Sequence, residues 1–107
     1  MSLDFHVASA RNDAPLGSPV FSLGVHEHGV LFGLVNSLPD YPQLRRMNDY
    51  YSEVVYAGAE LDALVRELDS VTSRFISEPQ IGTSLHRFRD VCNQASLQGM
   101  AVYGIAD

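Results

Sequence analysis

Lysine is absent from this 107-residue sequence, and cysteine occurs once, as Cys92. A single thiol excludes an internal disulfide and is typical of proteins from reducing compartments. Without lysine the chain also lacks the side chain that reaches a nucleotide phosphate in a P-loop, and its glycines fit neither common phosphate-binding pattern. The sequence therefore gives no support for nucleotide binding.

Positive charge is scarce, because seven arginines stand against thirteen acidic residues and give a formal net charge of -6. Such a surface repels phosphate backbones, so no nucleic-acid partner is expected. A moderately acidic balance also has a simpler explanation, since net charge keeps small proteins in solution. Acidity alone does not identify a function.

Long hydrophobic runs are missing as well. The most apolar segment, residues 30–35, is far shorter than the roughly 20 residues that cross a bilayer. The N-terminus lacks the basic region and apolar run of a signal peptide. We therefore expect a cytoplasmic protein with no membrane partner.

The composition that remains is that of a globular protein, with 46% hydrophobic and 19% charged residues. At this length one domain over residues 1–107 is expected, because two halves would each bury little apolar surface. Alternation predicts a strand at Leu3, Phe5 and Val7, and a second strand at Phe21, Leu23 and Val25. Residues 10–19 between them are rich in turn formers and predict a loop.

The middle of the chain is less regular. Residues 25–38 fit a buried strand or a short helix, and a helix is slightly favoured. Asp40, Pro42 and Gln43 predict a helix start, with a cap, a first-turn proline and a capping box. The apolar stripe that follows consists of Leu44, Met47 and Tyr51.

The C-terminal half gives the clearest pattern. Residues 53–57 predict a short strand, and apolar spacings of three and four after Gly58 predict a helix that Pro79 and Gly82 end. Thr83 or Ser84 is expected to cap a second helix, which Gly99 stops before a terminal strand. The expected stripes are Leu61, Leu64, Val65, Leu68, Val71 and Phe75, then Leu85, Phe88, Val91 or Cys92, and Ala95.

These elements predict an α+β fold, in which a small, mostly antiparallel sheet of three to four short strands packs against two main amphipathic helices. Met100, Val102, Tyr103 and Ile105 would form the last strand and tie the C-terminal segment into the sheet.

Three histidines are the candidates for a metal site. On a strand, His26 and His28 would share a face and His6 could supply a third ligand from a neighbouring strand. On a helix the two would diverge by about 200°. Surface or hydrogen-bonded structural histidines are the expected alternative, so no metal or other cofactor is assigned.

Catalytic residues are not apparent. Cys92 falls on or near the buried stripe of its helix, where a thiol acts as a small hydrophobe, and His86 lies on the opposite side. No nucleophile elbow occurs in the sequence. A non-enzymatic protein is therefore favoured.

Residues 41–69 combine most of the tyrosines with many acids. Tyrosine offers contact area at little entropic cost, and acids steer a basic partner. Tyr51 and Tyr56 fit the core of the fold equally well. The predicted partner-binding residues are Tyr41, Asp49, Tyr50, Tyr51, Glu53, Glu60 and Asp62.

The run Asp49-Tyr50-Tyr51, the strand after it and the helical segment 60–68 resemble the small acidic immunity proteins of bacterial polymorphic and contact-dependent toxin systems. The resemblance covers roughly residues 40–105. It implies a basic toxin domain as partner, held by stoichiometric occlusion without turnover.

Two other functions remain open from the sequence. The first is a metal-dependent or small-ligand-binding enzyme centred on His26 and His28, with His6 as a further ligand. The second is a homo-oligomeric structural or regulatory domain.

Overall fold

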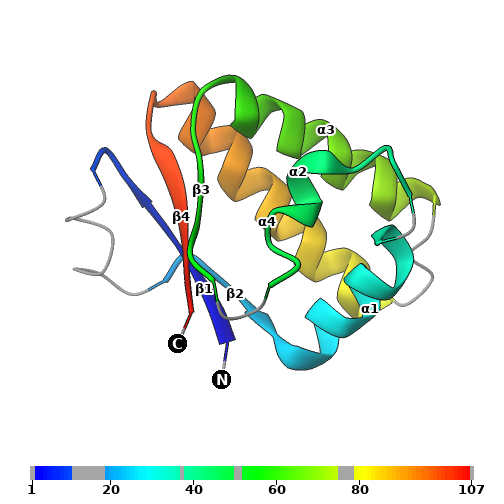
Figure 1. Ribbon diagram of the computed structural model, residues 1–107. Coiled ribbons are helices and arrows are strands. Elements are labelled where there is room, and N and C mark those ends of the chain that lie inside the picture. Colours follow the sequence, from blue (N-terminus) through cyan, green and yellow to red (C-terminus); the bar gives the residue numbers. More distant parts are fainter. Residues whose placement is uncertain (1, 11–18, 37, 50–51, 75–78, 107) are drawn as a thin grey trace.

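Four strands form one antiparallel sheet, and the helices lie on one side of it (Figure 1). The computed structural model describes residues 2–10, 19–36, 38–49, 52–74 and 79–106. In chain order the elements are β1 (Ser2–Ala8), β2 (Phe21–Gly24), α1 (Val25–Val35), α2 (Pro42–Arg45), β3 (Val54–Tyr56), α3 (Ala59–Arg74), α4 (Pro79–Leu97) and β4 (Ala101–Ala106).

The strand order is β2-β1-β4-β3, so the first and last strands of the chain form the centre of the sheet. Phe5 stands opposite Phe21 of β2 and Gly104 of β4, and Val55 of β3 stands opposite Tyr103. Leu3 and Phe5 are fully buried, as the alternating pattern requires. The structure confirms the predicted α+β fold and its antiparallel sheet.

Helices α3 and α4 pack against each other and supply most of the helical core. Their apolar stripes face inward because residues three and four positions apart share one side of a helix. The structure thus confirms the two amphipathic helices. The buried apolar residues are Leu61, Leu64, Leu68 and Val71 of α3, with Ile81, Leu85, Phe88, Cys92 and Ala95 of α4.

Aromatic rings join α4 to the sheet. The Phe88 ring lies 4.4 Å from the Phe5 ring and stacks 4.7 Å from that of Phe21, between ring centroids. Gly104 leaves room for this contact, because a Cβ atom there would lie 2.8 Å from Phe5 Cε1 and from Val54 Cγ1. The glycine is therefore a packing requirement of the sheet.

Some predicted boundaries were wrong. Val25 belongs to helix α1 and its side chain is 71% exposed, so β2 ends at Gly24. Pro79 begins α4 and Gly82 lies inside it, so neither residue ends α3 and neither Thr83 nor Ser84 caps α4. Proline is tolerated at a first helical position, where its missing N–H has no partner to lose.

The slightly favoured helix within residues 25–38 is confirmed as α1. The helix predicted from Pro42 lasts only to Arg45, and Tyr41 takes the N-cap position in place of Asp40. Tyr51 and Phe75, which complete two predicted stripes, lie outside the described residues. Across the described ranges, no helix combines the length and the apolar character needed to span a membrane.

Candidate functional site

Two of the tyrosines in residues 41–69 are interior. Tyr41 is 1% exposed, and its hydroxyl lies 3.0 Å from Ser70 Oγ and accepts a hydrogen bond from Arg74. Tyr56 is fully buried, donates to the Gln43 carbonyl at 2.6 Å, and has a raised pKa because of burial. The prediction that Tyr41 offers contact area to a partner is therefore wrong. Tyr50 and Tyr51 fall outside the described residues.

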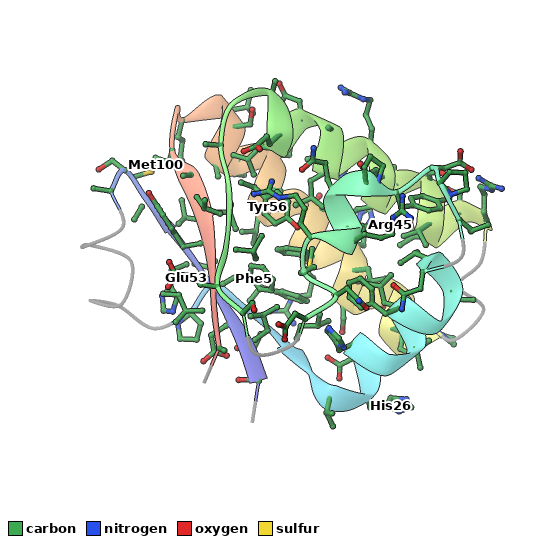
Figure 2. All side chains as sticks on the ribbon, in the orientation of Figure 1. Phe5, His26, Arg45, Glu53, Tyr56 and Met100 are labelled. Carbon is green, nitrogen blue, oxygen red and sulfur yellow. The ribbon has the colours of Figure 1, made fainter. Side chains whose placement is uncertain are left out.

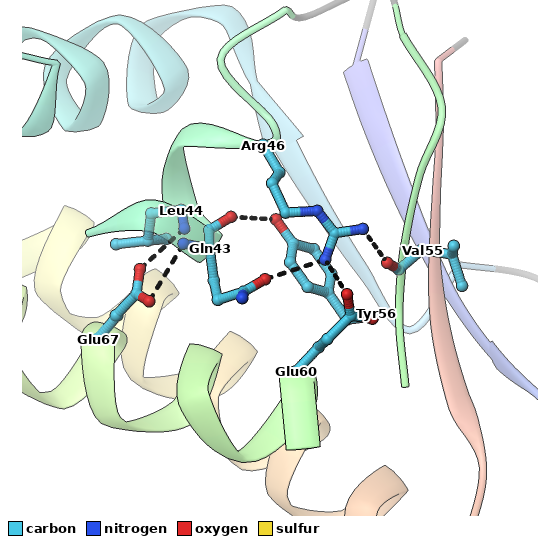
Figure 3. Close-up of polar contacts among 7 residues, drawn as sticks. All are labelled: Gln43, Leu44, Arg46, Val55, Tyr56, Glu60 and Glu67. Carbon is cyan, nitrogen blue, oxygen red and sulfur yellow. Dashed lines mark hydrogen bonds and ion pairs between the residues drawn. The ribbon is translucent and has the colours of Figure 1, made fainter. Parts of the chain in front are cut away.

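A buried carboxylate, Glu67 of α3, fixes the start of α2 (Figure 3). Its two oxygens accept hydrogen bonds from the backbone N–H groups of Gln43 at 3.1 Å and Leu44 at 2.9 Å. The first N–H groups of a helix have no partner within the helix, so a distant side chain serves as the cap. The predicted capping role of the Gln43 side chain was wrong, because that side chain accepts from Arg46 instead.

Arg46 binds the free edge of β3, which is an edge strand of the sheet (Figure 3). Its guanidinium donates to the Val55 carbonyl at 2.6 Å and lies over the Tyr56 ring, 4.6 Å from the centroid. It also forms an ion pair with Glu60 at 3.2 Å. Glu60, a predicted partner-binding residue, thus has its charge balanced by a neighbour.

The other predicted acids do not gather with Glu60. Asp49 is exposed and accepts from Ser52 Oγ at 2.6 Å, before β3 begins. Asp62 accepts from Ser96 Oγ of α4 at 2.7 Å, and it diverges from Glu60 because residues two apart on a helix differ by about 200°. The proposed single acidic and tyrosine-bearing patch is therefore not formed by the described residues of 41–69.

The histidines do not converge either. His26 and His28 lie on α1, where their spacing points them to different sides, and His6 lies on β1. The His28 ring lies 4.5 Å from the Phe32 ring, with Nε2 2.9 Å from the Met47 carbonyl oxygen. His26 is exposed. Within the described ranges, no group of three or more histidine, cysteine, aspartate or glutamate residues is placed to hold a metal ion.

Cys92 is fully buried, and burial raises the pKa of its thiol to about 12. A nucleophilic cysteine needs the opposite, a lowered pKa in a partly exposed place. The interpretation of Cys92 as a small core hydrophobe is confirmed.

The structure places a different tyrosine on an exposed surface. We call this surface the outer face: the side chains of the sheet that point away from the helices. They are Ser2, Asp4, His6 and Ala8 of β1, Ser22 of β2, Val55 of β3, and Ala101, Tyr103 and Ile105 of β4. None of the described helices covers it (Figure 1). Tyr103 lies at its centre, directly between Val55 of β3 and His6 of β1. Cross-strand neighbours of this kind are in side-chain contact range.

Carboxylates border this aromatic centre. Asp4 stands opposite Ile105 and accepts hydrogen bonds from the hydroxyls of Ser2 and Ser22, the latter at 2.7 Å. Partial burial acts to raise the pKa of Asp4, but these hydrogen bonds and nearby His6 lower it overall. Glu53 is exposed just before β3, on the opposite side of the sheet from Phe5 and Tyr56 (Figure 2). Both acids are far from residue 103 in sequence.

No arginine of the described ranges lies on the outer face. Every described arginine belongs to the helical layer, on or next to α2, α3 and α4. There some of them form ion pairs with acids of the same layer: Arg46 with Glu60, Arg74 with Asp40, and Arg89 with Asp69. The described arginines are Arg45, Arg46, Arg66, Arg74, Arg87 and Arg89.

A hollow of about 300 Å³ continues the outer face beyond Tyr103. It lies between the ends of β3 and β4 and the turns at Gly58 and Gly99, with Val55 and Tyr103 among its walls. Both glycines have positive φ, +56° and +68°, a conformation that other residues adopt only with strain. The backbone that shapes this hollow therefore depends on glycine.

Sequence reasoning missed Tyr103 because the acids that surround it come from other strands. Apolar residues on both faces of β4 hide its alternation, since Val102 is buried in the core while Tyr103 and Ile105 are half-buried on the outer face. Strand pairing brings Asp4 and Glu53 beside them, and pairing cannot be read from one segment alone. A sequence signal does exist: Asp4 and His6 are the polar positions of the alternating β1 pattern.

Comparison of the chain with protein-family models, with curated proteins and with solved structures finds no match in any of the three, so the geometry of the outer face carries the functional argument.

Proposed function

We propose that this chain is a non-enzymatic protein-binding domain of the immunity type, which covers a basic surface of a toxin partner with the outer face of its sheet. The observation that carries the proposal is the position of Tyr103, half-buried at the centre of a sheet face that the described helices leave open. The proposal keeps the acidic, tyrosine-bearing chemistry that the sequence suggests and moves it from residues 41–69 to the outer face.

The layout of the outer face fits the usual anatomy of a protein interface. Binding hot spots are enriched in tyrosine and lie near the centre of an interface, while polar and charged groups form its rim. Here Tyr103 has Val55 and Ile105 as apolar neighbours, and Asp4 and Glu53 border them. The 39% exposure of Val55 adds apolar area that a partner would cover.

Charge favours a basic partner. With the described arginines in the helical layer, the outer face carries Asp4, has Glu53 at its border, and holds no described arginine. Carboxylates on such a face attract a basic protein and repel an acidic one, which supports both association rate and choice of partner. A basic toxin domain has this chemistry, and occlusion of its active surface requires no turnover by the inhibitor.

The test places a positive charge on the outer face, directly beside the central Tyr103. The partner to be used is the protein encoded beside this chain in its genome, purified and titrated by calorimetry. We expect one-to-one binding that weakens as salt is added, because the steering charges are screened. Val55→Arg should lower the affinity at least about tenfold, a loss typical of a residue near a hot spot.

The matched control is Val25→Arg, which adds the same charge at a valine that is 71% exposed on α1. Circular dichroism and thermal melting should show both variants folded, and the control should bind as the parent does. No binding by the neighbouring protein, or equal losses in the two variants, would contradict the proposal. Light scattering that shows a stable dimer closed through the outer face would favour a homo-oligomeric domain in its place.

A further inference from the structure

We propose that the hollow beside Tyr103 takes an arginine side chain of the partner, an inference that rests on the proposed function and specifies its anchor. The hollow opens at the end of the outer face, so a partner that covers Tyr103 also passes its mouth. With a volume of about 300 Å³ it is suited to one long side chain and too small for a folded segment. Buried arginine is among the residues that contribute most to protein binding.

The residues that line the hollow suit both the methylene groups and the guanidinium of an arginine side chain. Val55 and Met100 offer apolar contact to its methylene groups, and the Tyr103 ring offers a face on which a guanidinium can stack. Arginine stacks on aromatic rings more readily than lysine, because its cation is planar and weakly hydrated. The geometry therefore favours a guanidinium over an ammonium group.

A carboxylate lies directly behind one wall of the hollow. Ser96 lines the hollow, and its hydroxyl donates to the Asp62 carboxylate at 2.7 Å. Helix α4 ends at Leu97 with no basic residue in its last turn, so the negative end of its dipole is not balanced from within the helix. The positive end of the α3 dipole lies at the same hollow and is offset by Asp62 in its first turn, whereas the charge of Glu60 is already balanced by Arg46.

The experiment titrates isotope-labelled protein with N-acetyl-arginine methylamide and follows amide shifts by NMR. We expect shifts confined to residues around the hollow, with a Kd on the order of a few millimolar for so small a probe. The citrulline analogue has the same shape without the charge and should bind much more weakly. Asp62→Asn should weaken arginine binding by up to about fivefold, the range of an exposed charge pair.

A second pair of variants tests the location. Ala57 lines the hollow and is exposed, so Ala57→Phe should fill the space and abolish the shifts. Ala59→Phe, at an exposed alanine two residues on, should leave them unchanged. Equal binding of arginine and citrulline analogues, or unchanged arginine binding in Ala57→Phe, would overturn the assignment. An absence of shifts at saturating probe would overturn it too, while the calorimetric test of the outer face stands independently.

Discussion

Glu67 shows at the scale of one residue how this chain keeps a charged group inside. The carboxylate is 8% exposed and is held by two backbone N–H groups at the start of α2. Buried charges are tolerated when hydrogen bonds replace the water they lose. Glu67 therefore ties the short α2 segment to the long helix α3.

Replacing Glu67 with glutamine tests this role. Glutamine keeps one acceptor but turns an NH₂ group towards the second backbone N–H, so one donor loses its partner. We expect Glu67→Gln to lower the free energy of unfolding by about 1–3 kcal/mol, the range for a lost hydrogen bond to a charged group. Urea unfolding followed by circular dichroism measures it.

Glu60→Gln is the matched control, because that carboxylate is exposed and makes only a surface ion pair with Arg46. Its effect should stay within about 1 kcal/mol. A Glu67→Gln protein as stable as the parent would mean that α2 does not depend on this cap.

Single residues were also where sequence reasoning was least successful. The spacing of acids and tyrosines in residues 41–69 favoured a binding patch, yet Tyr41 is in the core and Asp62 turns towards α4. Local composition cannot tell an exposed phenol from a buried one whose hydroxyl finds a partner. The outer face was not predicted because pairing between β1, β3 and β4 assembles it.

At the scale of elements the sequence was far more informative. Apolar spacing predicted α3, α4 and the strands around them, because a half-buried element repeats its own period in the sequence. The errors lay at boundaries, where Pro79 suits both the end of one helix and the first turn of the next. Such ambiguity is local and did not change the fold class.

Two glycines that end or precede helices offer a test at this scale. Gly99 follows α4 and Gly58 precedes α3, each with positive φ and open space around the missing Cβ. Alanine at either position should lower stability by about 1–2 kcal/mol through backbone strain alone. Thermal melting of Gly58→Ala and Gly99→Ala measures the effect.

Gly29→Ala is the matched control within a helix. Gly29 lies inside α1 with nothing near its missing Cβ and without a positive φ. Alanine there should raise stability by about 0.5–1 kcal/mol, because it restricts the unfolded chain and favours the helix. Equal effects at all three positions would show that backbone conformation is not the cause.

On the scale of the whole molecule, one hydrophobic core links all four strands with the helices. Cys92 lies in that core with no exposed surface, and its pKa is raised to about 12. At pH 8 the folded protein therefore holds almost no thiolate. A thiol reagent should reach Cys92 only when the core opens.

Labelling of Cys92 thus measures how the molecule unfolds. We expect the free energy of opening obtained from the labelling rate at pH 8 to equal the free energy of global unfolding by urea. Stability should also fall as pH rises above the pKa of the unfolded thiol, since the unfolded chain releases a proton that the folded one keeps. Labelling much faster than global unfolding would reveal a separate opening of α4.

The border strand of a sheet carries unpaired backbone N–H and C=O groups, and these can pair with a strand of another molecule. Such pairing is the first step towards fibres. The guanidinium of Arg46 already occupies the Val55 carbonyl that an incoming strand would need on the β3 side. The described helices thus leave one face of the sheet open, while the adjoining border is blocked against further copies of the molecule. The same three-residue strand therefore contributes Val55 to the outer face and resists self-polymerisation along its border.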